Sequence, residues 1–260
     1  MGPVGVDWPS AMRVLVLSDI HGNLQALEAV LAAAGEVDEV WNLGDVVGYG
    51  ANPNEVVDRI RALAKVHVRG NHDRVCCGLT SSQGFNPVAA QAAAWTQRTL
   101  TPENLEWLRE MPQGPVTGAG RAMCAHGSPL HEDQYIVTMR DAWAPLQQMA
   151  TEVTFFGHTH LQGGFSQRDE EWHENRPHYE TDDQAEHVEM EIAEGTRHLI
   201  NPGSVGQPRD HDWRAGFAIY DDVAATVVFH RVPYDVRATQ AAIRAAGLPE
   251  RLAARLSEGR

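Results

Sequence analysis

Short apolar runs alternate with amphipathic segments along the first quarter of the chain. After Arg13, the next four residues are all apolar, and the run stops at Ser18. This pattern predicts a fully buried strand over residues 13–17. The next segment repeats its apolar side chains at helical spacing between Asn23, a helix-capping residue, and Gly35, a residue typical of helix ends. Two more strands, 39–43 and 66–68, flank a helix that Asn52-Pro53 opens and that runs through Leu63. This alternation predicts a βαβ core with parallel strands.

The rest of the chain carries shorter patterns of the same two kinds. Helices are predicted at 87–98 and 101–111, and a further helical stretch at 235–256 is broken at 247–249. Strands are predicted at 121–125, 153–156, 217–220 and 226–232. Another strand begins at 197 and leads into the loop from Asn201 to Val205. The segment 168–191 contains ten acids and two arginines, so we expect a solvated loop or an exposed hairpin extension, with a cationic partner as the alternative. We therefore expect one domain over 12–260, with a helical insertion at about 84–111 and an acidic insertion at about 168–191. Residues 1–11 read as a loose N-terminal extension or an upstream start.

Composition narrows the classes of function. The 260 residues are 43% hydrophobic, enough for a sizeable core, yet no run approaches the roughly 20 apolar residues of a membrane helix. Residues 1–11 lack the features of a signal peptide, and the odd set of Cys76, Cys77 and Cys124 suits a reducing cytoplasm. A redox role for Cys76 and Cys77 is the alternative to ordinary structural residues, which we favour. The net charge of −14 disfavours stable binding to nucleic acid or to an anionic membrane, but it does not exclude a phosphate ester beside bound metal ions.

Five short motifs carry the candidate chemistry, and each lies beside a glycine or at a predicted strand end. They are Ser18-Asp19-Ile20-His21, Gly44-Asp45, Gly70-Asn71-His72-Asp73, Ala125-His126-Gly127 and Gly157-His158-Thr159-His160. In Asp19-x-His21 and His158-x-His160, the one-residue spacer puts both side chains on the same side of an extended segment. Imidazole, carboxylate and amide groups in one set are typical of two adjacent divalent ions, with Asp45 as the expected bridging carboxylate.

These motifs, in this order, resemble those of the calcineurin-like metallophosphoesterase superfamily. Ser18–Asn23, Gly44–Gly50 and Asn201–Arg209 are similar to its small prokaryotic phosphodiesterase branch, and the similarity covers roughly residues 12–232. The resemblance implies an α/β (α+β by some schemes) four-layer αββα sandwich of two mixed β-sheets flanked by helices. It also implies that one metal is held by Asp19, His21, Asp45 and His160, and the other by Asp45, Asn71, His126 and His158.

The resemblance further implies a mechanism and a set of residues around the substrate. A hydroxide that bridges two divalent ions attacks the phosphorus in line, His72 faces the substrate and offsets charge on the leaving oxygen, and Asp73 orients His72. Manganese is the expected metal, with iron, zinc or nickel as alternatives. The expected partner is a phosphorylated small molecule or nucleotide. From the residues themselves, Arg209 is a candidate phosphate contact, Tyr49 a candidate for stacking on a base, and Asn201 a structural turn residue that could also brace the metal site.

Three competing functions remain open. Serine/threonine protein phosphatases and dinucleoside polyphosphate hydrolases of the same superfamily are expected to carry an Asp-Arg pair in the second motif. Here that motif reads Gly44-Asp-Val-Val-Gly-Tyr-Gly50, which weakens both alternatives. The third alternative is a metal-bound scaffold with little turnover, but the uninterrupted ligand set and His72 favour an enzyme.

Overall fold

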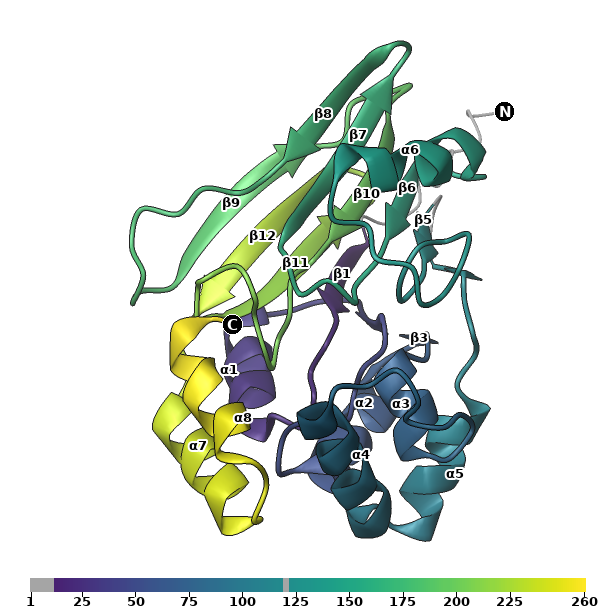
Figure 1. Ribbon diagram of the computed structural model, residues 1–260. Coiled ribbons are helices and arrows are strands. Elements are labelled where there is room, and N and C mark those ends of the chain that lie inside the picture. Colours follow the sequence, from purple (N-terminus) through teal and green to yellow (C-terminus); the bar gives the residue numbers. More distant parts are fainter. Residues whose placement is uncertain (1–11, 119–121) are drawn as a thin grey trace, which may run out of the picture.

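Two six-stranded mixed β-sheets form the centre of the molecule (Figure 1). The computed structural model describes residues 12–118 and 122–260. The predicted N-terminal extension, and Arg121 at the start of the predicted strand 121–125, therefore lie outside the described residues. The first sheet has the order β3-β2-β1-β11-β12-β9 and the second β4-β5-β6-β10-β7-β8. The strands of the first sheet are β1 (Arg13–Leu17), β2 (Glu39–Asn42), β3 (Val66–His67), β9 (Glu186–Glu191), β11 (Ala215–Asp221) and β12 (Thr226–Val232). Those of the second are β4 (Val116–Thr117), β5 (Ala122–Cys124), β6 (Val153–Phe155), β7 (Gly163–Arg168), β8 (Glu171–Asn175) and β10 (Arg197–Asn201).

Helices cover the outer face of each sheet. On the first sheet, α1 (Leu24–Ala34) packs against β11 and β12, α2 (Pro53–Leu63) packs against β2, and α7 (Val236–Ala245) lies beside α1 (Figure 1). On the second sheet, α6 (Met139–Gln148) packs against β7, β8 and β10. The remaining helices are α3 (Asn71–Cys76), α4 (Pro87–Thr99), α5 (Pro102–Glu110), α8 (Glu250–Ala254) and a final 3₁₀ turn over Arg255–Glu258. The layers therefore follow the order helix, sheet, sheet, helix, which confirms the predicted αββα fold.

The space between the sheets is filled by large apolar side chains from both of them. Trp41 of β2 and Phe155 of β6 are fully buried, and their rings meet edge to face at 6.0 Å between centroids. Tyr220 of β11 lies 5.3 Å from Phe155 and closes the same cluster. Because aromatic rings bury a large apolar area, this layer anchors the strands whose ends carry the polar motifs.

The acidic segment 168–191 departs from a simple loop. Its first half forms β8, the edge of the second sheet, and its second half forms β9, the edge of the first. The hairpin expectation is thus correct for β7 and β8, whereas β9 joins the other sheet.

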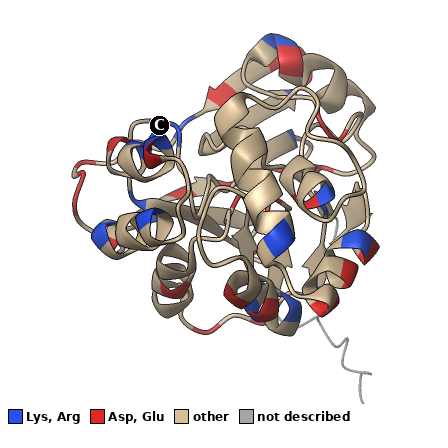
Figure 2. Ribbon diagram, turned by 60° about the horizontal axis from the view of Figure 1, so that its bottom comes forward, with Lys and Arg blue, Asp and Glu red and all other residues tan. Residues whose placement is uncertain are grey.

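The charges on the helices are mixed in sign. Along the helices in Figure 2, basic and acidic positions are interspersed.

The three cysteines are buried and make no disulfide with one another, which agrees with their reading as structural residues. Burial raises the pKa of each thiol, most strongly for Cys76 and Cys124, so none is poised as a thiolate at neutral pH. Within the described chain, no helix has the length and apolar character needed to cross a membrane.

Candidate metal centre

Every polar motif follows the carboxyl end of a strand. Asp19 and His21 come after β1, Asp45 after β2 and Asn71 after β3, and these three strands run parallel to one another. In the second sheet, His126 follows β5, and the pair His158 and His160 follows the parallel strand β6. Because parallel strands end at the same edge of a sheet, the motifs of both sheets meet at one end of the sandwich.

The structure gathers these side chains into two buried clusters that share one carboxylate. Asp19, His21, Asp45 and His160 each place a ligand atom within 4.8 Å of the others, and Asp45, His126 and His158 do the same. All six side chains are at most 4% exposed. Asn71 lies beside the second cluster, with its Oδ1 3.2 Å from His126 Nε2. The predicted grouping into two adjacent sites is therefore present in the geometry, with Asp45 between them.

The orientation of the imidazoles explains why these clusters fit cations. His21 Nδ1 lies 3.1 Å from the Val47 carbonyl, and His160 Nδ1 lies 2.5 Å from the Gln207 carbonyl. A carbonyl oxygen only accepts, so each Nδ1 carries the proton and each Nε2 presents a lone pair. The two Nε2 atoms face each other at 3.2 Å. Two such lone pairs repel unless a cation or a proton lies between them, and carbonyl partners of this kind are typical of metal-bound histidines.

The protonation states of the clustered side chains also indicate a site for cations. Burial raises the pKa of Asp19 to about 7, and its Oδ1 has no hydrogen-bond partner. Burial also lowers the pKa values of His21 and His160 well below their ordinary value, so both rings are neutral at pH 7. Burial opposes the charged forms of Asp45 and His126 too, but their mutual attraction holds the pKa of Asp45 low and raises that of His126 to about 9. A divalent ion would supply the positive charge that the two buried carboxylates lack.

The backbone of this region is held in an uncommon conformation. Asp19, His21, Asp45, His158 and His160 all have left-handed φ values, between 53° and 66°. For residues with a Cβ this costs ~1–3 kcal/mol each and persists only where the surroundings enforce it. Strain of this kind concentrates at functional sites, which supports the assignment of the clusters as a site.

Two glycines allow the close approach of the motif loops. A Cβ on Gly70 would lie 2.0 Å from Asp45 Oδ1, and a Cβ on Gly157 would lie 1.9 Å from Ser18 Oγ. Both distances are far below van der Waals contact, so any side chain here would displace the carboxylates. These glycines belong to the site because they leave room for Asp19 and Asp45.

The arrangement matches a known family. A family model described as the calcineurin-like phosphoesterase superfamily domain matches residues 12–223. The chain belongs to the calcineurin-like phosphoesterase superfamily. It is therefore a metallophosphoesterase by family, with two buried His/Asp clusters suited to a binuclear metal site.

Similar proteins support this placement. A crystal structure of a metallophosphoesterase from Sphaerobacter thermophilus has a TM-score of 0.82 and 43% identity, and the match covers 96% of this chain and 100% of that one. An uncharacterized protein of Methanocaldococcus jannaschii is 34% identical over 95% of this chain and 98% of its own length. A symmetrical bis(5'-nucleosyl)-tetraphosphatase of Erwinia tasmaniensis is 28% identical over 44% of each chain.

His72 lies beside both clusters of this phosphoesterase without belonging to either. Its ring centroid is 4.9 Å from that of His21 and 4.4 Å from that of Tyr49, and its backbone N–H donates to Asp45 Oδ1 at 2.8 Å. Burial lowers the pKa of His72 to about 4, so the ring is neutral at pH 7. A neutral ring still has one N–H to donate.

Asp73 does not bond to the His72 ring, contrary to the expectation from sequence. Its carboxylate accepts from the backbone N–H groups of Asp45 (2.8 Å), Val47 (3.2 Å) and Gly70 (2.9 Å). The reason is that helix α3 begins at Asn71, so Asp73 lies in the first helical turn and its side chain folds back to the helix start. Asp73 thus fixes the loop that carries Asp45.

The loop after β10 contributes Asn201 and Arg209. Asn201 Nδ2 donates to the Gly157 carbonyl at 2.9 Å and to Thr159 Oγ1 at 3.0 Å, so it braces the motif that holds His158 and His160. Arg209 lies close enough for its positive charge to lower the pKa values of Asp19 and His21, and its buried Nε has no hydrogen-bond partner. Its guanidinium also lies 6.0 Å from the Tyr49 ring, which itself is only 7% exposed.

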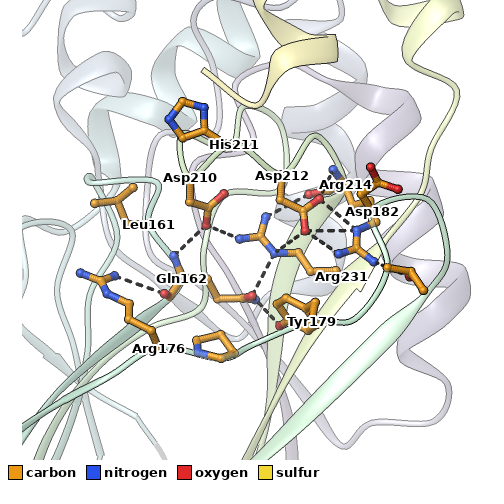
Figure 3. Close-up of a pocket in the computed structure, with 12 residues that line it drawn as sticks. Leu161, Gln162, Arg176, Tyr179, Asp182, Asp210, His211, Asp212, Arg214 and Arg231 are labelled. Carbon is orange, nitrogen blue, oxygen red and sulfur yellow. Dashed lines mark hydrogen bonds and ion pairs between the residues drawn. The ribbon is translucent and has the colours of Figure 1, made fainter.

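A buried ionic network that sequence reasoning missed holds this loop in place (Figure 3). Asp210, the neighbour of Arg209, accepts from the Arg231 guanidinium and from the backbone N–H of Gln162. Arg231 in turn donates to Gln162 Oε1 at 3.0 Å and to the Arg214 carbonyl at 3.1 Å. The one available signal was a charged residue inside the apolar run of β12, because a fully buried arginine must be paired.

Asp19→Asn is expected to stabilise the metal-free phosphoesterase at pH 8. Because burial raises the pKa of Asp19 from 3.8 to about 7, the folded state holds a proton that the unfolded chain releases, and stability falls as the pH rises from about 4 to about 7. Asparagine removes that charge, and its amide nitrogen in place of Oδ1 would face His160 Nε2, which lies 3.3 Å from Oδ1. In EDTA, the Tm of the variant should therefore exceed that of the parent at pH 8, and the gap should narrow towards pH 5. A constant gap between pH 5 and pH 8 would contradict this account.

Proposed function

We propose that this metallophosphoesterase hydrolyses phosphodiesters of the nucleotide type. We further propose that it uses two divalent ions, with manganese as the preferred metal. The observation that carries the proposal is the pair of buried clusters that share Asp45. Asp19, His21, Asp45 and His160 would hold one ion, and Asp45, Asn71, His126 and His158 the other. Mixed imidazole, carboxylate and amide donors suit manganese, iron, zinc or nickel. When bound, the two ions would lower the pKa of water and offset the charge of the phosphate oxygens.

The chain's own residues have defined tasks in this proposal. His72 lies beside the clusters and donates its N–H to the leaving oxygen as negative charge develops there. Arg209 has an unpartnered Nε and lies near Asp19, so its guanidinium can bind a phosphate oxygen. Asp73 accepts from two backbone N–H groups of the Asp45 loop and from that of Gly70 at the start of α3, and so acts as a positioning residue. Tyr49 packs against His21 and His72 and limits the site on that side.

A second candidate is hydrolysis of dinucleoside polyphosphates. The similarity to the symmetrical bis(5'-nucleosyl)-tetraphosphatase of Erwinia tasmaniensis favours it. The sequence Val46-Val-Gly-Tyr after Asp45 argues against it, because the second motif lacks the Asp-Arg pair expected of such hydrolases. We therefore rank phosphodiesters first.

The deciding experiment compares substrates on metal-stripped protein that is re-supplied with manganese, nickel, zinc or magnesium. The substrates are a chromogenic phosphodiester, the matching monoester and diadenosine tetraphosphate. We expect metal-dependent turnover with the diester preferred. Preference for the tetraphosphate would support the second candidate, and preference for the monoester would indicate a phosphatase. Two bound ions without turnover would contradict both candidates and favour a metal-bound scaffold.

A further inference from the structure

A cavity of about 480 Å³ opens directly beside the second cluster. Asn71 and His158 form its inner wall, so a group in the cavity lies next to the site proposed to bind the phosphate. The outer walls come from the segment 74–85, after the start of α3, and from the loop that carries Asp133 and Tyr135. Its volume falls within the range of pockets that enclose small organic ligands.

Two aromatic rings line this cavity beside the site histidines. Tyr135 stacks on His158 at 3.9 Å between centroids and 22° between planes, yet 48% of it is exposed. Phe85 lies 4.6 Å from the His72 ring. Because one face of Tyr135 is covered by His158 and the residue is still half exposed, the rest of the ring is accessible from the cavity. A planar group attached to a phosphate would meet it there.

The charge of the cavity favours a neutral ligand group. Arg74 is only 12% exposed, and its guanidinium is paired with Glu132 at 3.2 Å and with Asp133. These two carboxylates offset the positive charge of Arg74 and occupy both of its terminal nitrogens, whereas its Nε has no hydrogen-bond partner. Gln83, whose side chain makes no hydrogen bond among the described residues, offers both a donor and an acceptor at the rim.

We propose that this cavity binds the nucleoside part of the substrate, with the base stacked on Tyr135. This assignment rests on the proposed function and adds the group that selects the substrate. Stacking on an aromatic side chain tolerates any base because every base has a π face, so the cavity would select nucleosides as a class.

The test compares two esters with the same leaving group, thymidine 5'-(p-nitrophenyl phosphate) and methyl p-nitrophenyl phosphate. We expect the parent to prefer the thymidine ester in kcat/KM, and Tyr135→Ala to reduce the ratio of the two values by about 5- to 150-fold. Tyr135→Phe keeps the ring and should retain most of the preference. Trp143→Ala, which removes an exposed aromatic residue on α6, is the matched control and should leave the ratio unchanged.

Two outcomes would overturn the cavity assignment. One is a parent enzyme that hydrolyses both esters with the same efficiency. The other is an equal loss for both esters in Tyr135→Ala, because Tyr135 would then act only through its contact with His158. Failure of the parent to hydrolyse either ester with any metal would instead refute the proposed function, so the two failures are distinguishable.

Discussion

His72→Ala is expected to lower kcat by about 10²–10⁴-fold, the usual contribution of a group that assists proton transfer or charge at a leaving oxygen. Metal binding should persist, because His72 belongs to neither cluster. Two measurements check this: kcat at saturating manganese, and the number of metal ions bound per chain by elemental analysis.

The leaving group makes this prediction sharper. If His72 acts on the leaving oxygen, the loss should grow as the leaving group becomes more basic, so an alkyl leaving group should suffer more than p-nitrophenolate. His173→Ala is a suitable control because this exposed histidine lies on β8, in the acidic segment. A loss independent of leaving group, or a loss of bound metal, would count against the assigned role.

Asp45→Asn is expected to weaken both metal sites at once, because Asp45 is the carboxylate that both clusters share. Even residues that merely support metal ligands contribute 10–100-fold, so removal of a shared ligand should lower kcat/KM by more than about 100-fold. Asparagine retains an oxygen that can accept from the backbone N–H of His72, as Asp45 Oδ1 does at 2.8 Å, and this favours a folded variant. The measurement is metal content after dialysis together with kcat/KM.

Two single-site variants separate the contributions of the clusters. His21→Ala alters only the first cluster and His126→Ala only the second. Each should weaken one ion, whereas Asp45→Asn should weaken both. An Asp45→Asn protein that keeps two ions and parental activity would refute the bridging assignment.

The individual metal ligands could be predicted because each lies in a short motif at a predicted strand end, whereas their grouping into two clusters came from the resemblance to the superfamily. Asp19 and Asp45 follow the ends of β1 and β2, and parallel strands end at the same edge of a sheet. The βαβ alternation was enough to place Asp19, Asp45 and Asn71 at one sheet edge. The histidines of the second sheet reach the same place only through the packing of the two sheets. Helices α1, α2 and α7 could also be predicted from local signals, since Asn23 and Asp235 cap α1 and α7 with their side chains and Pro53 opens α2.

The parts that escaped prediction depend on distant contacts or on ambiguous local signals. Arg231 and Asp210 are 21 residues apart, and only the pairing of β11 with β12 brings the network together. Helix α6 was missed because Pro145 lies inside it and suggests a break, although Thr138 and Asp141 form a capping box at its start. The partners of Asp73 likewise depend on how close the α3 start lies to the Asp45 loop, which the pattern of residues does not reveal.

The acidic segment has a consequence for the behaviour of the protein at high concentration. Strands β8 and β9 are edges of the two sheets, and an unpaired edge is a template on which another chain can add a strand. Their sequences, Glu-Trp-His-Glu-Asn and Glu-His-Val-Glu-Met-Glu, place glutamates along both edges. Two molecules that approach edge to edge therefore bring like charges together. The glutamates of β8 and β9 thus oppose self-association and fibril growth through these two edges.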